Sequence, residues 1–221
     1  MTIQDLPNPL LLAGIIFLAG MLPLALATMT AFIKISVVLA ILRNALGLQQ
    51  TPPNLVLNAG AVVLTFYVMY PVLLGIGAGL EGLDKTADGI GIIADALPIV
   101  IDEIRDFMYP LTDPDQLEFF MSTTTKIWPA EITESIEPQD FLIVLPSFFL
   151  SELESAIELG VIIFIPFLII DMVVANTLMA LGMIMVPPTS IALPIKLMFF
   201  VGANGWALVI DRLLTSYAVQ I

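Results

Sequence analysis

A few ionisable side chains lie inside long apolar stretches of this sequence, and these residues could carry chemistry. Lys34 lies within residues 10–42, and Asp171 and Lys196 flank a charge-free run over residues 172–195. An ionisable residue in a membrane segment is costly, so each needs a partner, a carbonyl group or water. For Lys34, snorkelling to a membrane interface is an equally good interpretation. Such residues could form a path for protons or sodium ions, or they could join helices as ion pairs.

Three glutamates, Glu152, Glu154 and Glu158, lie at the entrance of the third apolar region. Glu154 and Glu158 are four residues apart and share a helix face, whereas Glu152 points elsewhere. They could form a proton relay, line a polar channel, bind a neighbouring subunit or mark the membrane boundary. A relay needs a basic or histidine partner nearby, so we favour subunit contact or a pore lining. We place Lys34 and Arg43 in the same group.

The residue types argue against catalysis. Histidine and cysteine are absent, which excludes disulfides, thiol nucleophiles and imidazole or thiolate metal sites. The acidic residues lack the spacing of a calcium loop, and the chain has no nucleophile–base pair, phosphate loop or basic nucleic-acid face. We therefore expect a protein that is not an enzyme and that has no metal and no cofactor.

The composition is that of a membrane protein. Hydrophobic residues make up 59% and charged residues 12% of the chain, against about 45–50% and about 25% in soluble domains. Fourteen of the 20 acidic residues lie in residues 81–140, so the net charge of −13 belongs mainly to one segment. No basic region precedes the first apolar run, so we expect no cleavable signal peptide.

Three segments follow from this pattern. We predict an N-terminal hydrophobic helical hairpin over residues 1–80, an acidic helical segment over 81–140, and a C-terminal helical hairpin over 141–221. Residues 10–42 would form a helix of roughly 50 Å, longer than the hydrocarbon core of about 30 Å. This helix either breaks near Pro23 or continues beyond the membrane plane.

Prolines also punctuate the acidic segment. Apolar residues recur at helical spacing over residues 90–108, where Pro98 either kinks the helix or splits it. A second helix is predicted to start at Asp113 with Pro114 at its first position.

The C-terminal hairpin turns at a pair of prolines. Pro187 and Pro188 prevent a continuous helix, and a turn near residues 183–187 brings Asp171 and Lys196 to the same depth on opposite arms. The apex then presents flexible apolar side chains on non-helical backbone. It consists of Gly182, Met183, Ile184, Met185 and Val186.

Basic residues give the orientation. Arg43 lies in the short first loop and favours a cytoplasmic position for it, which puts the acidic segment outside and points the methionine tip inward. Arg212 argues the other way. The charges within the apolar runs argue for surroundings of protein or water, and hence for an oligomer or complex.

Three stretches together resemble a known family. They read RNALGLQQTPPN, LPSFFLSELESAIELG and FLIIDMVVANTLMALGMIMVPPTSIALPIKLMFFVGANGW. In this order they are similar to the FliP/SctR family (members of the YscR, HrcR and SpaP kind), the export-gate subunit of flagellar and virulence type III secretion systems. The resemblance covers nearly the whole chain and is weakest over residues 81–140.

The resemblance implies an all-α fold of membrane-associated helical hairpins, with about four long hydrophobic helices, that assembles in a ring. It implies a homo-oligomer, a pentamer by family resemblance, with FliQ/SctS-like, FliR/SctT-like, FlhA/SctV-like and FlhB/SctU-like components as partners and unfolded proteins as substrates. It also implies a place in the bacterial inner membrane, within the basal body of the secretion system and largely at its periplasmic side when assembled.

The family's methionine-rich constriction loop matches Met183, Ile184 and Met185. The family usually has consecutive methionines, so Ile184 departs from it and would stiffen the gasket. Packing of these residues in a helix core is the plain alternative. We interpret Asp171 and Lys196 as a structural ion pair. As a function of another class, we keep an ion-coupled secondary transporter that uses Asp171, Lys196 and Lys34.

The sequence gives mixed signals on the branch of the family. The stretch RNALGLQQ and the absence of a signal peptide favour the virulence injectisome, whereas QQTPPN and the IRDFM and DPDQLEFF stretches favour the flagellar branch. GANGW departs from the aspartate-containing version common in both. We favour the injectisome.

Overall fold

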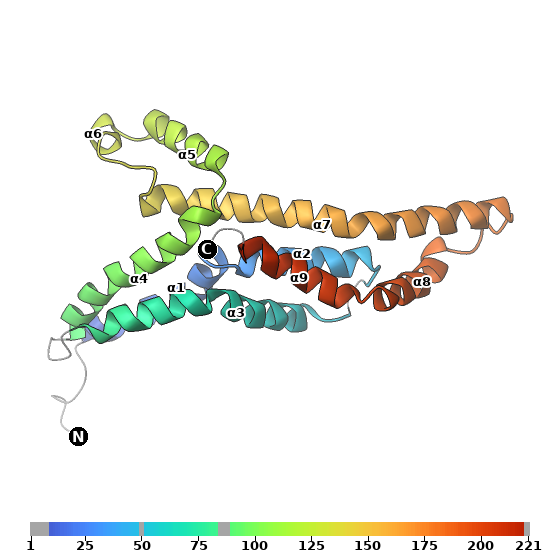
Figure 1. The fold of residues 1–221 in the computed structure, drawn as a ribbon, viewed down its shortest axis with the longest axis horizontal. Helices are drawn as coiled ribbons and strands as arrows, with labels where there is room; N and C mark the ends of the chain where they lie inside the picture. Colours follow the sequence, from blue (N-terminus) through green and yellow to red (C-terminus); the bar gives the residue numbers. More distant parts are fainter. Residues whose placement is uncertain (1–8, 49–50, 84–88, 219–221) are drawn as a thin grey trace, which may run out of the picture. The chain divides into compact units, whose positions relative to one another are not determined.

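The computed structural model describes residues 9–48, 51–83 and 89–218, and all regular structure in these residues is helical (Figure 1). The all-α prediction is therefore confirmed. The helices are α1 (Pro9–Thr28), α2 (Phe32–Ala45), α3 (Asn54–Glu81), α4 (Gly89–Leu111), α5 (Pro114–Ile127), α6 (Ala130–Thr133), α7 (Phe141–Ala180), α8 (Pro188–Gly202) and α9 (Gly205–Ala218).

The chain divides into two compact units. The first unit comprises Met1–Ala31 and Met69–Ser151, and the second unit comprises Phe32–Val68 and Glu152–Ile221. Each unit combines stretches that are distant in the sequence. The division into the segments 1–80, 81–140 and 141–221 rests on composition along the chain, and it stays a prediction.

Two helices, α3 and α7, are each long and apolar enough to cross a membrane. The number rises to four if α1 with α2, and α8 with α9, each count as one broken span. The predicted membrane association is thereby confirmed, and the predicted number of about four long hydrophobic helices is reached only when each bent pair counts as one span.

The first apolar run breaks between α1 and α2, after Thr28. Pro23 lies inside α1, so the alternative that the run breaks near Pro23 is wrong. Hydroxyl groups support the helix end, since Thr28 Oγ1 donates to the carbonyl of Leu24 at 2.9 Å and Thr30 Oγ1 to that of Leu26 at 2.5 Å. The Leu26 carbonyl is one of the last four of α1, which have no intrahelical partner, so the Thr30 hydroxyl satisfies it.

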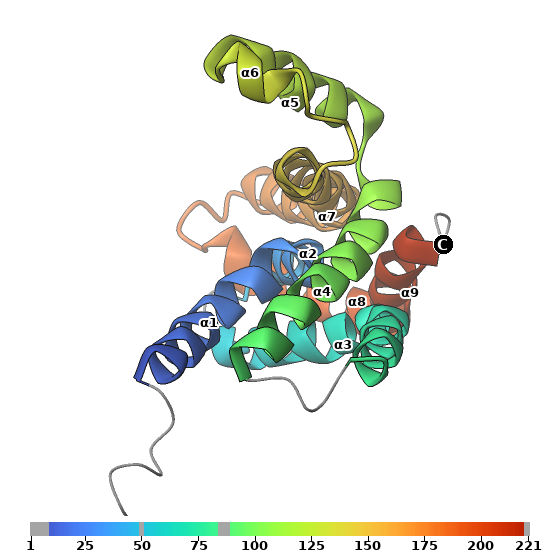
Figure 2. The same cartoon turned by 90° about the vertical axis from the view of Figure 1, so that its left-hand side faces the viewer.

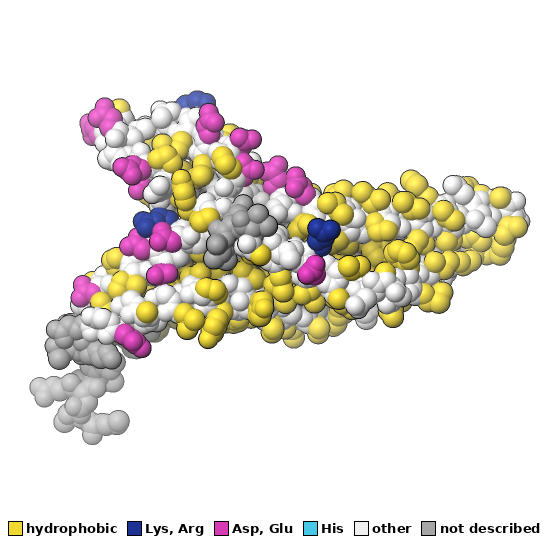
Figure 3. Space-filling model, viewed as in Figure 1, with side chains coloured by type: hydrophobic (Ala, Val, Ile, Leu, Met, Phe, Trp, Pro, Cys, Tyr) yellow, Lys and Arg dark blue, Asp and Glu magenta, His cyan; other side chains and the backbone are white. Residues whose placement is uncertain are grey.

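The first unit contains the acidic helices. Helix α5 begins as predicted, with Pro114 at its first position and the Asp113 carboxylate accepting a bond from the Asp115 amide at 2.8 Å. Helix α4 runs on through Pro98, so the alternative that Pro98 splits it is wrong. Within this unit α5 and α6 lie side by side (Figure 2). Acidic side chains gather over α4, α5 and α6 (Figure 3).

Helices α2 and α9 each bury an apolar face in the second unit. Buried side chains recur along α2 at three- and four-residue steps, the pattern of a helix with one apolar face: Ile35, Val38, Leu39 and Leu42. Val209 and Leu213 of α9 are also buried. Gly160 of α7 lies against Ile41 of α2, so these helices approach closely at that point.

This close approach gives a first prediction. A Cβ atom at Gly160 would lie 3.1 Å from Ile41 Cγ2 and 3.3 Å from its Cβ, both near the backbone and hard to displace. Overpacking typically costs about 1–3 kcal/mol, more than the gain of about 1 kcal/mol from alanine in a helix. We expect Gly160→Ala to lower the thermal unfolding midpoint of the detergent-extracted protein.

Gly60→Ala is the matched control, because a Cβ atom at this position of α3 meets nothing within 4 Å. It should leave the midpoint unchanged or raise it. Equal midpoints for the two variants would contradict the close approach of α2 and α7.

Candidate functional site: two charge contacts and a methionine tip

The structure brings Asp171 and Lys196 together within the second unit. Lys196 Nζ on α8 lies 2.6 Å from Asp171 Oδ2 on α7. The same ammonium donates to the Ala45 carbonyl, at the end of α2, at 2.9 Å. Lys196 is buried, whereas the Asp171 side chain is 38% exposed at the edge of a pocket of about 280 Å³. The contact therefore joins three helices and keeps one carboxylate partly open.

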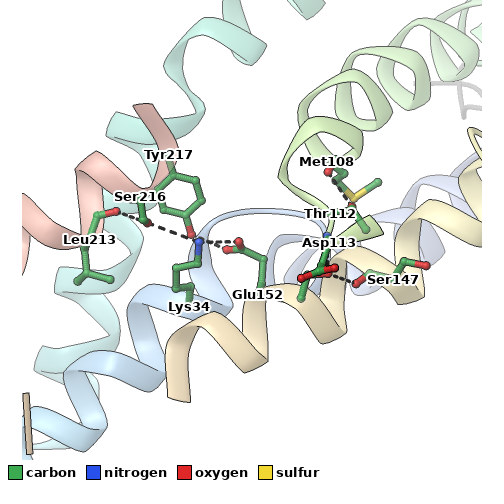
Figure 4. A network of polar contacts seen from close by, with 10 residues as sticks. Lys34, Met108, Thr112, Asp113, Ser147, Glu152, Leu213, Ser216 and Tyr217 are labelled. Atoms are coloured by element: carbon green, nitrogen blue, oxygen red, sulfur yellow. Dashed lines mark hydrogen bonds and ion pairs between the residues drawn. The ribbon is translucent and has the colours of Figure 1, made fainter. Parts of the chain in front are cut away.

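A second charge contact joins α2, α7 and α9 (Figure 4). Lys34 Nζ lies 2.7 Å from Glu152 Oε1, and these side chains are 4% and 1% exposed. The Tyr217 hydroxyl donates to Glu152 Oε2 at 2.5 Å, and the Lys34 ammonium lies 4.2 Å from the centre of the Tyr217 ring. Lys34 also donates to Ser216 Oγ at 3.5 Å.

Both oxygens of the buried carboxylate have a donor. The Lys34 ammonium binds one oxygen of Glu152 and the Tyr217 hydroxyl donates to the other. Charge-assisted hydrogen bonds and the aromatic ring offset the cost of removing both ions from water.

The structure corrects the grouping of Lys34 and Glu152 with residues that contact another subunit or line a pore. Both side chains are buried within their own chain, where each finds an opposite charge. Snorkelling of Lys34 is wrong for the same reason.

The other residues of that group lie elsewhere. Glu154 and Glu158 are exposed, and their predicted contacts stay a prediction. Arg43 bonds to the carbonyl of Pro52 and to Asn54 Oδ1 across the loop after α2, so it supports that loop.

Sequence reasoning missed two parts of this contact. Lys34 and Glu152 were not paired with each other, although Glu152 was already assigned to a different helix face from Glu154 and Glu158. Tyr217 was not singled out, because a tyrosine near the end of a chain carries no signal of its own.

The hairpin tip is built on a tightly capped helix end. Gly182 has a φ of +73°, which a glycine adopts without strain. Its amide donates to the Met179 carbonyl at 3.0 Å, and the Met183 amide donates to the Leu178 carbonyl at 2.9 Å. These two bonds form a Schellman motif, which satisfies the last carbonyls of α7.

The start of α8, the helix that follows the tip, is also fixed. Pro187 occupies the N-cap of α8 and Pro188 its first position, where a missing amide hydrogen costs nothing. Val186 packs against a small cluster of Val174, Leu178 and Ala192. The backbone on both sides of the tip is thereby fixed.

Between these two ends the apolar side chains project outward. Met183 is 43%, Ile184 87% and Met185 97% exposed. They are not packed in a helix core of this chain, which was the plain alternative. Hydrophobic side chains also cover the adjoining ends of α7 and α8 (Figure 3).

The described residues offer little for a metal, since they contain no group of three or more His, Cys, Asp or Glu side chains placed to hold one.

These features define the class: an all-helical, membrane-associated protein with internal charge pairs and an exposed apolar hairpin tip. A sequence profile of the FliP family matches residues 15–213. The chain therefore belongs to the FliP family, and the resemblance stated from the sequence is confirmed.

Curated relatives match almost end to end. The "Probable translocation protein y4yL" of Sinorhizobium fredii is 40% identical over 96% of each chain. The "Harpin secretion protein HrpW" of Pseudomonas syringae pv. syringae is 39% identical over 90% of this chain and 95% of its own. The "Virulence protein YscR" of Salmonella typhimurium is 37% identical over 97% of this chain and 100% of its own.

The buried contact gives a second prediction. Glu152→Gln leaves the Lys34 ammonium without its counter-charge, and breaking one side of a buried pair typically costs about 3–5 kcal/mol. We expect a loss of this size in the free energy of unfolding in detergent. Replacing the whole contact, by Lys34→Met, Glu152→Met and Tyr217→Phe together, should recover most of it.

Asp102→Asn is the control, since the Asp102–Arg105 pair on α4 is exposed and such pairs contribute about 1 kcal/mol or less. If Glu152→Gln lowers the free energy of unfolding no more than Asp102→Asn does, the buried contact contributes no more to stability than an exposed ion pair.

Proposed function

We propose that this chain is the core pore subunit of a type III secretion export apparatus, forming the gated entrance for unfolded proteins that cross the bacterial inner membrane. Its membership of the FliP family supports this proposal. Relatives whose printed names refer to translocation, secretion and virulence also support it. The role is structural, and no catalytic step is assigned to any residue.

The exposed tip carries the proposal. Met185 and Ile184 are the most exposed of the large apolar side chains in the part of the chain that the structure describes. Exposed apolar surface of this kind marks an interaction site. In a ring of identical subunits, tips that point to a common axis would cover one another. Met183, Ile184 and Met185 are the residues that we assign to this constriction.

The chemistry of the tip suits a gate for unfolded chains. A ring of thioether and aliphatic side chains excludes ions by dewetting when it is closed. Unbranched methionine side chains have several rotamers and repack around substrates of any sequence. The Schellman motif and the paired prolines hold the backbone in place while the side chains move.

The ion pair of Asp171 and Lys196 has a structural role in this proposal. It ties the two arms of the hairpin together and links them to α2 through the Ala45 carbonyl. In Figure 1 the turn at residues 181–187 lies at the free end of the hairpin formed by α7 and α8. Movement of one arm against the other would displace the tip.

The assembly is proposed on the family resemblance. The chain would form a homo-oligomeric ring, a pentamer, with FliQ/SctS-like and FliR/SctT-like subunits and FlhA/SctV-like and FlhB/SctU-like components. The ring would lie in the inner membrane, within the basal body and largely at its periplasmic side. Relatives named for harpin secretion and for virulence favour the injectisome branch.

No observation favours the ion-coupled transporter. Asp171 with Lys196, and Lys34 with Glu152, form two separate contacts whose acids lie about 28 Å apart along α7, at 1.5 Å per residue. The relatives' printed names refer to translocation and secretion of proteins.

The assembly itself provides a third prediction. We expect the detergent-extracted protein to form one discrete oligomer by native mass, and to take up its two smaller partners when they are co-expressed. Asp171→Asn should shift the mass towards monomers, because it leaves the Lys196 charge without its counter-ion. Adding Lys196→Met should restore the oligomer in part, since the Ala45 carbonyl then still lacks a donor.

A transporter predicts the opposite pattern, in which Asp171→Asn keeps the native mass and abolishes ion flux. A monomer or dimer indifferent to the partners would overturn the pore proposal.

The tip provides a fourth prediction. Truncating Met183 and Met185 to alanine removes much of the apolar surface of the constriction, so we expect the closed pore to conduct small ions while secretion continues. The measurement is ion conductance of the assembled complex in planar bilayers.

Met172→Ala with Met198→Ala is the matched control, because it removes two exposed methionines from the helical arms. Unchanged conductance in the tip variant, or an equal leak in the control, would remove the tip from the gate.

A further inference from the structure

A second hollow of the second unit, apart from the tip and the charge contacts, has the shape and chemistry of a lipid site. It has a volume of about 390 Å³ and lies between α7 and the bend of α8 and α9. Its walls are aliphatic and aromatic, and Arg212 is the one charged side chain among the described residues that line it. We call this hollow the Arg212 groove.

The groove exists because α8 and α9 meet at an angle of 64°. Asn204 has a φ of +52° at this bend, a conformation that asparagine tolerates better than most residues. The ring of Phe200 packs where a Cβ atom of residue 205 would lie, so Gly205 is required for the close turn. A bend held in this way keeps α9 from continuing α8 and leaves space beside α7.

Three aromatic side chains that contact one another line part of the groove. The Phe167 ring on α7 lies edge-on to the Phe199 ring on α8, with centroids 6.2 Å apart, and 6.3 Å from the Phe200 ring. The lining residues on α7 extend from Leu159 to Phe167, which is about 12 Å at 1.5 Å per residue. The groove therefore follows α7 for about two turns and has aromatic side chains among its walls.

Within the described residues, the groove has one charged side chain in its lining, Arg212. Arg212 lies seven residues beyond Gly205 on α9, about two helical turns away. It is exposed, and its guanidinium forms no ion pair within the part of the chain that the structure describes. Asp211 and Glu158 are exposed acids next to lining residues, but neither lines the groove itself.

From these features we propose that the Arg212 groove binds an anionic phospholipid, with an acyl chain along the apolar walls and the phosphate at the Arg212 guanidinium. The walls are aliphatic and aromatic, with no acidic side chain among the described residues that form them, which suits an acyl chain. The walls belong to helices with the length and composition of membrane spans, and guanidinium matches phosphate oxygens in geometry and charge.

The test uses the full chain in detergent with a phosphatidylglycerol that carries a photoreactive diazirine in one acyl chain. We expect cross-linked peptides from residues 159–167 and 199–209. The same photolipid with a phosphatidylcholine head group should cross-link less, by roughly two- to fivefold, the range that an exposed charge pair provides.

Two pairs of variants locate the site. Ile162→Trp fills the groove and should abolish cross-linking there, whereas Val161→Trp, at an exposed position outside the lining, should not. Arg212→Gln should remove the preference for phosphatidylglycerol, whereas Lys126→Gln, which removes an exposed charge on α5, should keep it.

Three results would overturn the proposal. One is equal cross-linking in Ile162→Trp and the unchanged protein, and another is a head-group preference that survives Arg212→Gln. The third is the absence of cross-linked peptides from residues 159–167 and 199–209 in the unchanged protein, as expected if a second copy of the chain covers the groove. None of these results bears on the proposed gate, which is tested at the tip.

Discussion

The second unit depends on the cost of burying a charge. Lys34 and Glu152 lie on different helices, and removing either ion from water costs several kcal/mol unless an opposite charge and further hydrogen bonds compensate. The ammonium, the carboxylate and the Tyr217 hydroxyl compensate one another only when α2, α7 and α9 stand in one register. A shift between these helices would separate the charges and leave each ion buried without its partner, which costs more than a loss of apolar contact.

A second ion pair, closer to the tip, also joins helices through opposite charges. Asp171 lies 19 residues beyond Glu152 on α7, about 28 Å away, and Lys196 couples it to α8 and to the end of α2. Beyond Asp171 the hairpin extends for about another 14 Å of helix with no ionisable residue before α7 ends at Ala180. The charged contacts therefore define a rigid base, and only apolar packing and the capped turn support the part that projects from it.

The sequence alone was enough for the parts of this architecture that depend on local rules. The all-helical fold, the start of α5 at Asp113, the turn before Pro187 and the meeting of Asp171 with Lys196 all follow from hydrophobic runs and from proline and capping chemistry. The break after α1 was misplaced, because Pro23 remains inside its helix and the helix ends only at Thr28, where threonine hydroxyls bind its carbonyls. The partner of Lys34 depends on packing between distant helices, which no local pattern encodes.

The tip itself divides into a fixed and a free part, and this division bears on how a gate of the proposed kind would work. The Met183 amide is tied to the Leu178 carbonyl and its side chain is less than half exposed, whereas the Met185 side chain is almost fully exposed. Ile184 between them is β-branched and has few rotamers. A constriction built from such tips would rely on Met185 for adaptation to the substrate and on Ile184 for a constant diameter. The departure from consecutive methionines would then favour a tighter seal over a more adaptable one.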